Sequence, residues 1–472
     1  MQTDNMPIPW TGSEIIKAVS GKYLSGSIEH LFKGISIDSR KISESDLFVA
    51  IKGKIYDSHL FMDDVIKKKV KGFLVNTKSA EQMPIAKWQG EKKFCCAVPD
   101  TVKALGDLAS YNRTRSGIST IAITGSNGKT TTKEMTASIL KKKFNTLASK
   151  GNFNNEIGLP LTLFNINPSH EWAVVELGMN HLGEIGRLAE ICMPDIGVIT
   201  NIGSAHLEGL GSLEGVMKAK GELLEKIKPG GTAVLNGDDP RVMLLAKKTE
   251  NKTLLFGRGS NAEIKAVSVK KKGLGTCFKL ELPLETIFID LKIPGEFMIS
   301  NALASAASGY LLGFTAEEIK AGIEDFKPAN GRMSIIKTLK GVNIIDDTYN
   351  SNPDSMEAAI KTLKDLKQGA DSILITGDML ELGEQAEFMH KKIGTMAAQS
   401  KITRLYATGS FAEKVAEGAL GENMDSKKIF TGTNKEIMDD LSLRLKEGDW
   451  LLVKGSRAIG MEIIVKKIKG CI

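Results

Sequence analysis

A short glycine-rich segment that follows an apolar strand constrains this chain more than any other feature of its sequence. Residues 121–132 read IAITGSNGKTTT, an apolar run, then two glycines, a Lys-Thr pair and a stretch with helical spacing. Glycines let backbone N–H groups turn inward around a phosphate, and the following helix N-terminus adds a partial positive charge. In such a loop Lys129 neutralises the β- and γ-phosphates, and the Thr130 hydroxyl binds Mg²⁺. The segment predicts a nucleoside triphosphate site, followed by a helix over residues 133–144.

The spacing of this loop is shorter than that of the general phosphate loop. The general motif has a glycine five residues before Gly128, where this chain has Ile123. A tight strand–helix turn without a ligand uses the same residue types, so the segment alone leaves that alternative open. The residues that we expect to contact the triphosphate are Gly125, Ser126, Asn127, Gly128, Lys129, Thr130 and Thr131.

Two further strands end in side chains that suit a metal–phosphate site. Residues 172–178 place Glu176 at the end of an apolar strand, and the strand at 196–200 leads through a Gly-Ser turn to His206. Ligands of open parallel sheets bind at the carboxyl ends of the strands, where neighbouring ends converge. Glu176 and His206 are therefore metal-site candidates, while a solvated glutamate and a structural histidine remain the alternatives.

Two other polar segments lie nearby in the sequence. The loop at 150–158, KGNFNNEIG, contains Asn152, Asn154 and Asn155, whose short amides suit a polar ligand but are also common in plain turns. Lys220 stands in the segment MKAKGEL and by itself reads as part of a solvated helix face.

Beyond residue 328 apolar strands alternate regularly with amphipathic helices. Candidate strands at 342–345, 372–375, 404–407 and 450–453 predict a parallel sheet covered on both faces. Pro328 and Gly331 mark a hinge, and Arg332 directly after it could reach a γ-phosphate only when the domains close, with a plain surface arginine as the alternative. The first of these strands ends in Asp346 and Asp347, which suit a ribose hydroxyl or a metal. The turn at 454–457 is basic and suits a carboxylate.

Composition excludes several classes of protein. Lys+Arg 63 against Asp+Glu 56 leaves a net charge of only +7, and aromatic residues make up 6%, which is little for nucleic-acid binding. No apolar run approaches the ~18 residues that a membrane span needs. The start, MQTDNMPIPW, lacks the basic-then-apolar pattern of a secretory signal, and five scattered cysteines without a CxxC pair suit a reducing compartment. We therefore expect a soluble, cytoplasmic protein.

The order of these segments resembles the Mur ligases, the ATP-dependent amide ligases that build the stem peptide of peptidoglycan. The resemblance spans nearly the whole chain. The segment 124–131 is similar to the family's short phosphate loop, which accounts for its spacing. Segments 151–158, 176–180 and 201–207 stand where the family has substrate and metal loops, and SIDSRK at 36–41 looks like its nucleotide-sugar motif.

The resemblance implies an α/β protein of three domains. They are a small α/β N-terminal domain that binds the UDP-sugar (1–114), a central ATP-binding domain with a P-loop-type, mostly parallel sheet (115–327), and a C-terminal Rossmann-like, doubly wound domain that binds the incoming amine (328–472). Dividing 472 residues by roughly 150 per domain also gives about three.

Two segments of the last region indicate which reaction of the family this chain performs. DDTYNSNPDSM at 346–356 and GDMLELG at 377–383 are similar to the member that adds a dipeptide. The member that adds the third amino acid carries an Asp-Asn-Pro-Arg turn, which this sequence lacks. The resemblance thus implies joining of D-alanyl-D-alanine to UDP-N-acetylmuramoyl-tripeptide through an acyl phosphate, with ATP, two Mg²⁺ ions, small-molecule partners only and a monomeric chain.

The resemblance also implies roles for single residues around ATP. Thr130 and Glu176 would share one Mg²⁺, and His206 would belong to a second metal site. Lys220 would be the family's carbamylated lysine, because a carbamate turns a repelling cation into the oxygen ligand that Mg²⁺ favours. Asn301 would contact the adenine.

Further roles concern the other substrates. Arg332 would meet the γ-phosphate and Asp347 the ribose, while Ser39 and Arg40 resemble the uridine-nucleotide contacts. One departure from the family lies at Asp57-Ser58-His59, where relatives have Gly in the middle. The remaining substrate candidates are Asn152, Asn154, Asn155, Asn180, Tyr349, Asn350 and Asn352, with Glu381 as a further candidate for the dipeptide pocket.

Two other functions compete with this interpretation. A folate-type polyglutamate synthetase shares the phosphate loop, but such enzymes are expected to begin near that loop, without the region around Asp38-Ser39-Arg40. A phosphate-loop switch or motor would hydrolyse the nucleotide without any amine acceptor. Phosphate release that requires both the tripeptide and the dipeptide separates the ligase from the switch.

Overall fold

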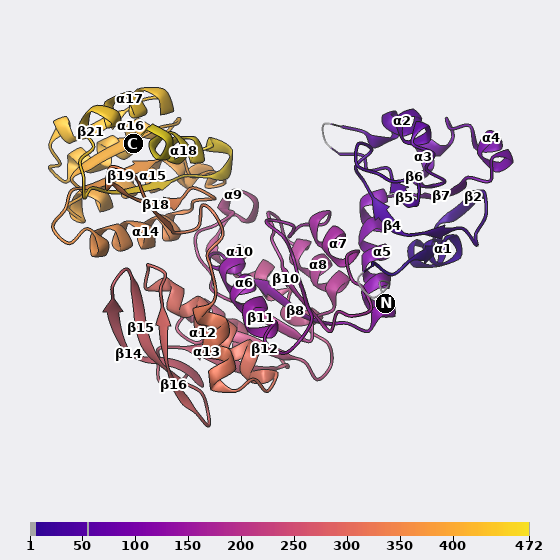
Figure 1. Ribbon diagram of the computed structural model, residues 1–472, viewed down its shortest axis with the longest axis horizontal. Helices are drawn as coiled ribbons and strands as arrows, with labels where there is room; N and C mark the ends of the chain where they lie inside the picture. The colour runs from indigo at the N-terminus through magenta and orange to yellow at the C-terminus, as the bar shows by residue number, and fades with distance from the viewer. Residues whose placement is uncertain (1–5, 54–55, 472) are drawn as a thin grey trace.

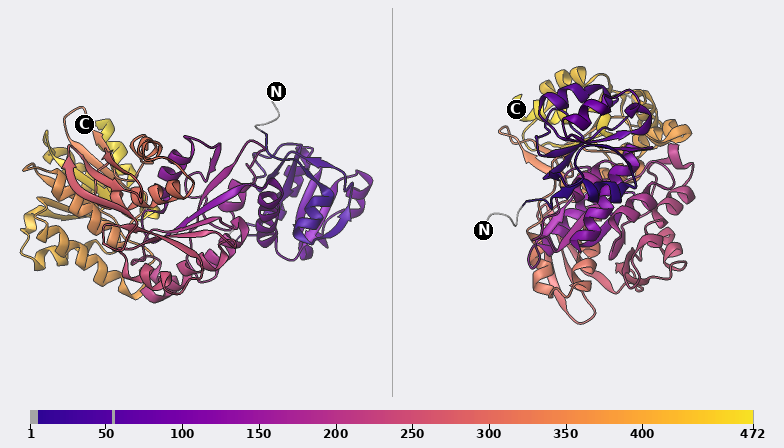
Figure 2. Two further views of the ribbon diagram at one scale, coloured as in Figure 1. Left: turned by 90° about the horizontal axis from the view of Figure 1, so that it is seen from below. Right: turned by 90° about the vertical axis from the view of Figure 1, so that its right-hand side faces the viewer.

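The computed structural model describes residues 6–53 and 56–471, which form three lobes arranged along an elongated molecule (Figures 1 and 2). The N-terminal lobe lies at one end, and the C-terminal lobe lies over the far end of the central lobe. None of the helices in the described ranges combines the length and hydropathy that a bilayer crossing requires.

The N-terminal lobe contains a five-stranded sheet in the order β2-β7-β6-β5-β4, parallel except for the β2–β7 pair. Strands β5, β6 and β7 are short apolar runs with mostly buried side chains, as the sequence predicts at 47–51 and 72–75. The elements are β1 (Trp10–Thr11), α1 (Gly12–Val19), β2 (Lys22–Ser25), β3 (Leu31–Phe32), β4 (Gly34–Ser36), β5 (Asp46–Val49), α2 (Met62–Lys67), β6 (Gly72–Asn76), α3 (Thr77–Ala80), α4 (Ile85–Gly90), β7 (Phe94–Val98) and α5 (Thr101–Ser116).

Helix α5 joins this lobe to the central one. Asp100 caps its first turn, and its apolar side packs against α7 and α8 of the central lobe, with Leu105 and Leu108 fully buried. The boundary that the sequence suggests at residue 114 falls inside this helix. Gly117, with φ +69°, ends the helix before the central sheet begins.

The central lobe is built on a nine-stranded sheet in the order β16-β15-β14-β13-β12-β11-β8-β10-β9. The strands from β9 to β14 run parallel, and only β14, β15 and β16 form an antiparallel edge. The elements are β8 (Ser119–Thr124), α6 (Lys129–Leu140), β9 (Thr146–Ala148), α7 (Gly158–Leu163), β10 (Trp172–Glu176), α8 (Glu184–Cys192), β11 (Ile196–Ile199), α9 (Leu207–Leu210), α10 (Leu213–Gly221), β12 (Thr232–Asn236), α11 (Pro240–Ala246), β13 (Lys252–Gly257), β14 (Ile264–Lys272), β15 (Gly275–Glu281), β16 (Thr286–Leu291), α12 (Phe297–Leu311) and α13 (Ala316–Glu324).

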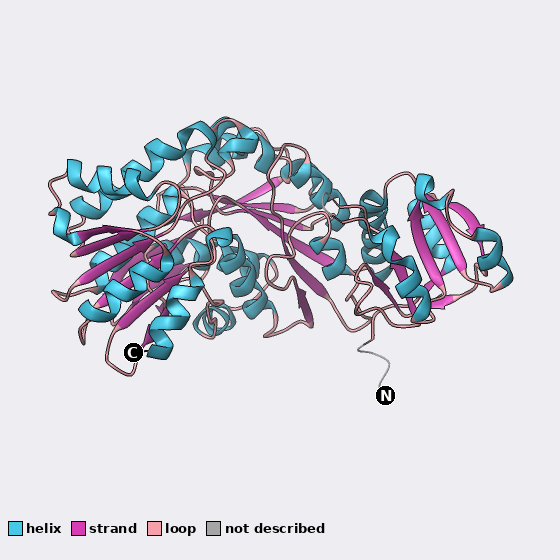
Figure 3. Cartoon of the chain, turned by 90° about the horizontal axis from the view of Figure 1, so that it is seen from above, coloured by secondary structure: helices cyan, strands magenta, loops and turns pink. Residues whose placement is uncertain are grey.

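The register of this sheet aligns the ends of three strands. Glu176 of β10 pairs with Ile123 of β8, and Ile199 of β11 pairs with Thr124. These three strands are apolar because helices cover both faces of the sheet: α6, α12 and α13 on one, and α7, α8, α10 and α11 on the other. Figure 3 shows helices on both sides of the central sheet. The loops after β8, β10 and β11 therefore open at the same edge of the sheet.

Helix α6 differs from its expected position at 133–144. It begins at Lys129 and ends at Leu140. The buried residues of the first turn are threonines, so the periodicity of apolar residues begins only at Met135, after the helix has already started at the Lys-Thr residues of the loop. The phosphate loop thus runs directly into the helix N-terminus.

The C-terminal lobe has a six-stranded sheet in the order β17-β18-β22-β19-β20-β21, parallel except for β17–β18 and covered by helices on both faces (Figure 3). The α/β architecture and the four strands expected here are confirmed. The elements are β17 (Ser334–Lys337), β18 (Asn343–Asp347), α14 (Pro353–Leu366), β19 (Ser372–Thr376), α15 (Ala386–Gln399), β20 (Arg404–Ala407), α16 (Ala412–Gly421), β21 (Ile429–Thr431), α17 (Asn434–Arg444), β22 (Trp450–Lys454) and α18 (Glu462–Cys471).

Candidate active site

A cavity of about 820 Å³ opens where the central and C-terminal lobes face each other. Its walls come from the loops after β8, β10 and β11, from the start of α12 and from the strand ends of β18 and β22. Gly125, Lys220, Ser39 and Arg40 do not line it. The predicted residues that do are Ser126, Asn127, Gly128, Lys129, Thr130, Thr131, Asn152, Asn154, Asn155, Glu176, Asn180, His206, Asn301, Arg332, Asp347, Tyr349, Asn350, Asn352 and Glu381.

The phosphate loop owes its shape to two glycines and to the neighbouring strand-end loop. Gly128 has φ +81°, and a Cβ there would lie 2.2 Å from Oδ1 of the buried Asn301. Asn201 accepts a hydrogen bond from the backbone N–H of Asn127 at 2.9 Å. The Nζ of Lys129 donates to the carbonyl of Gly125 at 2.7 Å, and burial lowers the pKa of Lys129, partly offset by Glu176. A cation is thus held at the mouth of the loop.

Glu176 lies beside this loop and joins it to the asparagine loop. The Thr130 hydroxyl donates to Glu176 Oε2 at 2.6 Å, and Asn154 Nδ2 donates to Oε1 at 2.8 Å. The glutamate is only 2% exposed, yet the acid has partners on both oxygens. A hydroxyl and a carboxylate side by side form the oxygen donor set that Mg²⁺ prefers.

His206 faces a glutamate from the other lobe. Its Nδ1 lies 2.6 Å from Glu381 Oε2, an ion pair by distance rather than a well-formed hydrogen bond. The contact with His206, together with Lys129, holds the pKa of Glu381 below its ordinary value. The backbone N–H of Glu208 also donates to the Glu381 carbonyl at 3.1 Å. Both His206 and Glu381 have left-handed φ angles, +59° and +63°, which aim these side chains at each other.

Lys220 corrects the reading of its helix as a solvated face. It lies on α10 and is 1% exposed. Burial, and then the nearby charge of Lys129, lower its pKa well below the ordinary value. The helical period was the signal for this, because Lys220 lies four residues after the buried Val216 and next to the buried Ala219, on the same face of α10.

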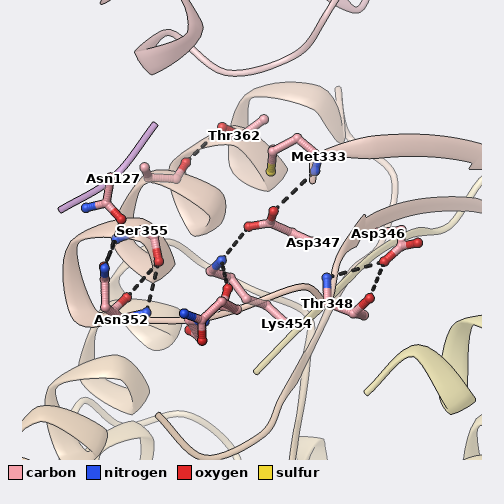
Figure 4. Close-up of polar contacts among 12 residues, drawn as sticks. Asn127, Met333, Asp346, Asp347, Thr348, Asn352, Ser355, Thr362 and Lys454 are labelled. Atoms are coloured by element: carbon pink, nitrogen blue, oxygen red, sulfur yellow. Dashed lines mark hydrogen bonds and ion pairs between the residues drawn. The ribbon is translucent and has the colours of Figure 1, made fainter. Parts of the chain in front are cut away.

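The C-terminal lobe brings an arginine and an aspartate to the cavity. The guanidinium carbon of Arg332 lies 4.0 Å from the ring centroid of Tyr349. Asp347 accepts hydrogen bonds from Lys454 Nζ at 2.5 Å and from the Met333 N–H at 3.2 Å (Figure 4). Lys454 also donates to the Asn350 carbonyl at 2.9 Å. The basic turn at 454–457 thus holds a carboxylate of this chain, that of Asp347.

The predicted sugar-nucleotide residues of the N-terminal lobe lie apart from this cavity. Arg40 donates to both carboxylate oxygens of Asp38 at 2.9 and 3.0 Å, which lowers the pKa of Asp38 to about 2. His59 contacts Asp57 at 2.6 Å through Nδ1 and accepts from the Asn76 N–H at 3.0 Å through Nε2. His59 therefore fastens the end of β6, and both ring nitrogens are engaged.

Among the residues at the cavity that the sequence did not single out, four are charged: Glu184, Asp239, Arg241 and Asp354. Asp239 caps α11 and accepts from the Ile202 N–H at 2.7 Å, so it supports the loop that leads to His206. The Asp239-Pro240 pair after β12 is a helix-start signal that pointed to this edge. Within residues 6–53 and 56–471 no group of three or more His, Cys, Asp or Glu side chains forms a ready-made metal site.

Comparison with known proteins places this cavity in context. Residues 123–309 match the Mur ligase middle domain, and residues 331–457 match the Mur ligase, glutamate ligase domain. The chain is 34% identical over 459 residues to UDP-N-acetylmuramoyl-tripeptide--D-alanyl-D-alanine ligase of Bacillus subtilis (strain 168), covering 97% of this chain and 98% of that protein.

Solved structures agree with this match. A crystal structure of MurF from Acinetobacter baumannii has a TM-score of 0.89 and 32% identity, covering 98% of this chain and 99% of that one. The MurF ligase from Thermotoga maritima in complex with ADP has a TM-score of 0.82 and 28% identity, covering 93% of this chain and 97% of that one.

Proposed function

The chain belongs to the Mur ligase family, and from that premise we propose that it joins D-alanyl-D-alanine to UDP-N-acetylmuramoyl-tripeptide in an ATP-dependent reaction. The observation that carries the proposal is the cavity in which the phosphate loop of one lobe faces Arg332 and Glu381 of another. The near full-length match to UDP-N-acetylmuramoyl-tripeptide--D-alanyl-D-alanine ligase of Bacillus subtilis supports the choice of substrates. The product is a precursor of peptidoglycan, which links the chain to cell-wall synthesis.

We propose that the reaction begins with attack of the tripeptide carboxylate on the γ-phosphate of ATP. ADP leaves, and an acyl phosphate forms. Because two anions must approach each other, the step needs cations placed before the substrates arrive. Lys129 lies in the phosphate loop, and Arg332 enters from the C-terminal lobe close enough to lower the pKa of Lys129. These two side chains would stabilise the charge that develops on the transferred phosphoryl group.

The donor sets around the loop fit Mg²⁺. Thr130 and Glu176 would hold one ion, and His206 with a carbamylated Lys220 would serve a second. Burial lowers the pKa of Lys220 well below its ordinary value, which favours the neutral amine, the form that combines with carbon dioxide. When bound, the ions supply Lewis-acid stabilisation of the phosphate oxygens.

In the second step the amine of D-alanyl-D-alanine attacks the acyl carbon, and the tetrahedral intermediate expels phosphate. Water would hydrolyse the same acyl phosphate, so the site must exclude it. The facing lobes, with Tyr349, Asn350 and Asn352 on one side and the asparagine loop on the other, would enclose the reacting groups. Asn301 and Asp347 would contact the adenosine, and Ser39 and Arg40 would bind the uridine nucleotide. We further propose that the enzyme works as a monomer in the cytoplasm and serves cell shape and division.

A coupled assay of phosphate release tests the proposal. Release should require ATP, the UDP-tripeptide and D-alanyl-D-alanine together, and the tripeptides with lysine and with diaminopimelate should be tested in parallel. Release without the dipeptide would support a phosphate-loop switch instead. Ligation of glutamate to a folate would support the polyglutamate synthetase.

The variant Lys129→Ala isolates the phosphate loop. It should abolish ligation, because removing one donor from a developing charge costs on the order of 10²–10³-fold in rate. The protein should stay folded by circular dichroism and urea unfolding. Retained ATP turnover would contradict the assignment of Lys129.

A further inference from the structure

The N-terminal end of α14 in the C-terminal lobe rests on two loops of the central lobe. Asn352 Nδ2 donates a hydrogen bond to Asn127 Oδ1 of the phosphate loop at 2.9 Å (Figure 4). Two residues further along the chain, Asp354 Oδ2 accepts from the Ser204 N–H at 2.7 Å. A Cβ at Gly203 would lie 2.1 Å from that same Asp354 oxygen, so only glycine permits this approach. We call these five residues the docking contact.

The capping of α14 fixes the direction of the Asn352 amide. Asn352 is the N-cap, and its Oδ1 accepts from the Ser355 N–H at 2.9 Å, while Ser355 Oγ accepts from the Asn352 N–H at 3.0 Å. Since the oxygen is used by the cap, the NH₂ group is the end that points at the phosphate loop. The helix therefore presents a donor of defined position to the central lobe.

The central lobe holds the phosphate loop without help from Asn352. The Asn127 N–H donates to Asn201 Oδ1, and the Asn127 carbonyl accepts from Thr200 Oγ1 at 2.6 Å and from Asn201 Nδ2 at 3.0 Å. The Ser126 hydroxyl is bonded to the backbone of Gly203. The Oδ1 atom of Asn127 is the acceptor that the loop turns toward the C-terminal lobe.

We propose that Asn352 is a positioning residue that docks the C-terminal lobe onto the phosphate loop through Asn127. The lobe that α14 belongs to also carries Arg332 and Asp347, which must reach the nucleotide for the reaction. The inference rests on the proposed function for the identity of that nucleotide. Asn352 thereby acts on the reaction through the phosphate loop rather than through the dipeptide, the role that the resemblance suggested.

Loss of the docking contact should separate turnover from nucleotide binding. Asn352→Ser keeps a good N-cap but is too short to reach Asn127. One neutral hydrogen bond corresponds to a change of about 5- to 10-fold, so kcat for phosphate release should fall by that factor. The Kd of ATP, measured by calorimetry, should stay within about twofold, because the central lobe fixes the loop by itself.

A double-mutant cycle completes the test. In an Asn127→Ser background, Asn352→Ser should cause no further loss of kcat, since the bond is already broken. Asn352→Asp also caps helices but cannot donate a hydrogen bond, so its kcat should fall as in Asn352→Ser. Agreement between the two variants would show that the loss does not come from a folding defect of one of them. Lys364→Gln is the matched control on the same helix. Lys364 is exposed on α14 and takes no part in the docking contact, so activity should be unchanged.

Three outcomes would overturn the inference. Losses of kcat that add in the double variant would show that Asn352 does not act through Asn127. A Kd of ATP that rises as much as kcat falls would make Asn352 a nucleotide contact. An equal loss of kcat in Lys364→Gln would mean that any change on α14 has this effect. Failure of the wild-type chain to bind ATP would instead refute the proposed function itself.

Discussion

At the scale of single residues, burial shifts the pKa of several side chains. Burial lowers the pKa of Lys129 in the phosphate loop and, further, that of Lys220. The same cause raises the pKa of the thiols of Cys95, Cys96 and Cys192 to about 12. The two lysines belong to the proposed chemistry, whereas the cysteines lie in the core and report only on folding.

Cys192 gives a prediction about pH. The unfolded thiol loses its proton near its ordinary pKa of 9.0, while the buried thiol keeps it up to about 12. In that window the folded chain binds more protons than the unfolded chain, so stability falls as pH rises above about 9. Wild type should lose about 1 kcal/mol more than Cys192→Ala between pH 8 and pH 10. Urea unfolding at the two pH values measures this, and parallel losses would contradict the assignment.

At the scale of elements, the junction of the phosphate loop and α6 depends on how closely α12 approaches it. Asn301 lies on α12 directly beneath Gly128, and Ser305 of the same helix donates to the Thr132 carbonyl at 3.2 Å. Helix α12 thereby packs against the phosphate loop and the first turn of α6. A side chain at Gly128 would have to displace Asn301 as well as adopt a left-handed backbone.

Two glycine variants separate these effects. Gly128→Ala and Gly117→Ala both place a side chain at a left-handed φ, +81° and +69°, at a cost of roughly 1–2 kcal/mol. A Cβ at Gly117 meets no atom within 4 Å, whereas at Gly128 it meets Asn301. Gly117→Ala should lose stability but keep ATP affinity within about twofold.

Gly128→Ala should lose stability and also bind ATP at least about tenfold more weakly, because the loop must shift. Urea unfolding and calorimetric titration with ATP distinguish the two variants. Equal ATP affinity in both would mean that the approach of Asn301 does not shape the loop.

At the scale of the whole molecule, the sequence predicts what depends on local pattern. The strand ends at Glu176 and Asp347 and the glycine-rich loop are local, and the structure has them where the pattern puts them. The pattern could not predict that His206 meets Glu381 or that Asn127 meets Asn352. The latter two are 225 positions apart, and their contact depends on how two lobes dock.

Helix α5 couples the N-terminal and central lobes at the other end of the molecule. One apolar cluster around this helix includes residues of both lobes. Cys96 on β7 and Cys192 on α8 both belong to this cluster, and both are fully buried. The N-terminal lobe also has a smaller apolar cluster of its own, around Phe73 and Trp88, but the core around α5 is shared by the two lobes. The two lobes should therefore unfold together.

Thiol labelling in urea tests this. The raised pKa of Cys96 and Cys192 and their burial should suppress labelling of the folded chain, so each thiol reports on unfolding around it. Mass spectrometry should find both thiols labelled at the same urea concentration. Leu108→Ala on α5 should lower both midpoints equally, because the cavity, worth about 2–5 kcal/mol, lies in the shared core. Labelling of Cys96 well before Cys192 would show instead that the N-terminal lobe unfolds alone, with α5 staying on the central sheet.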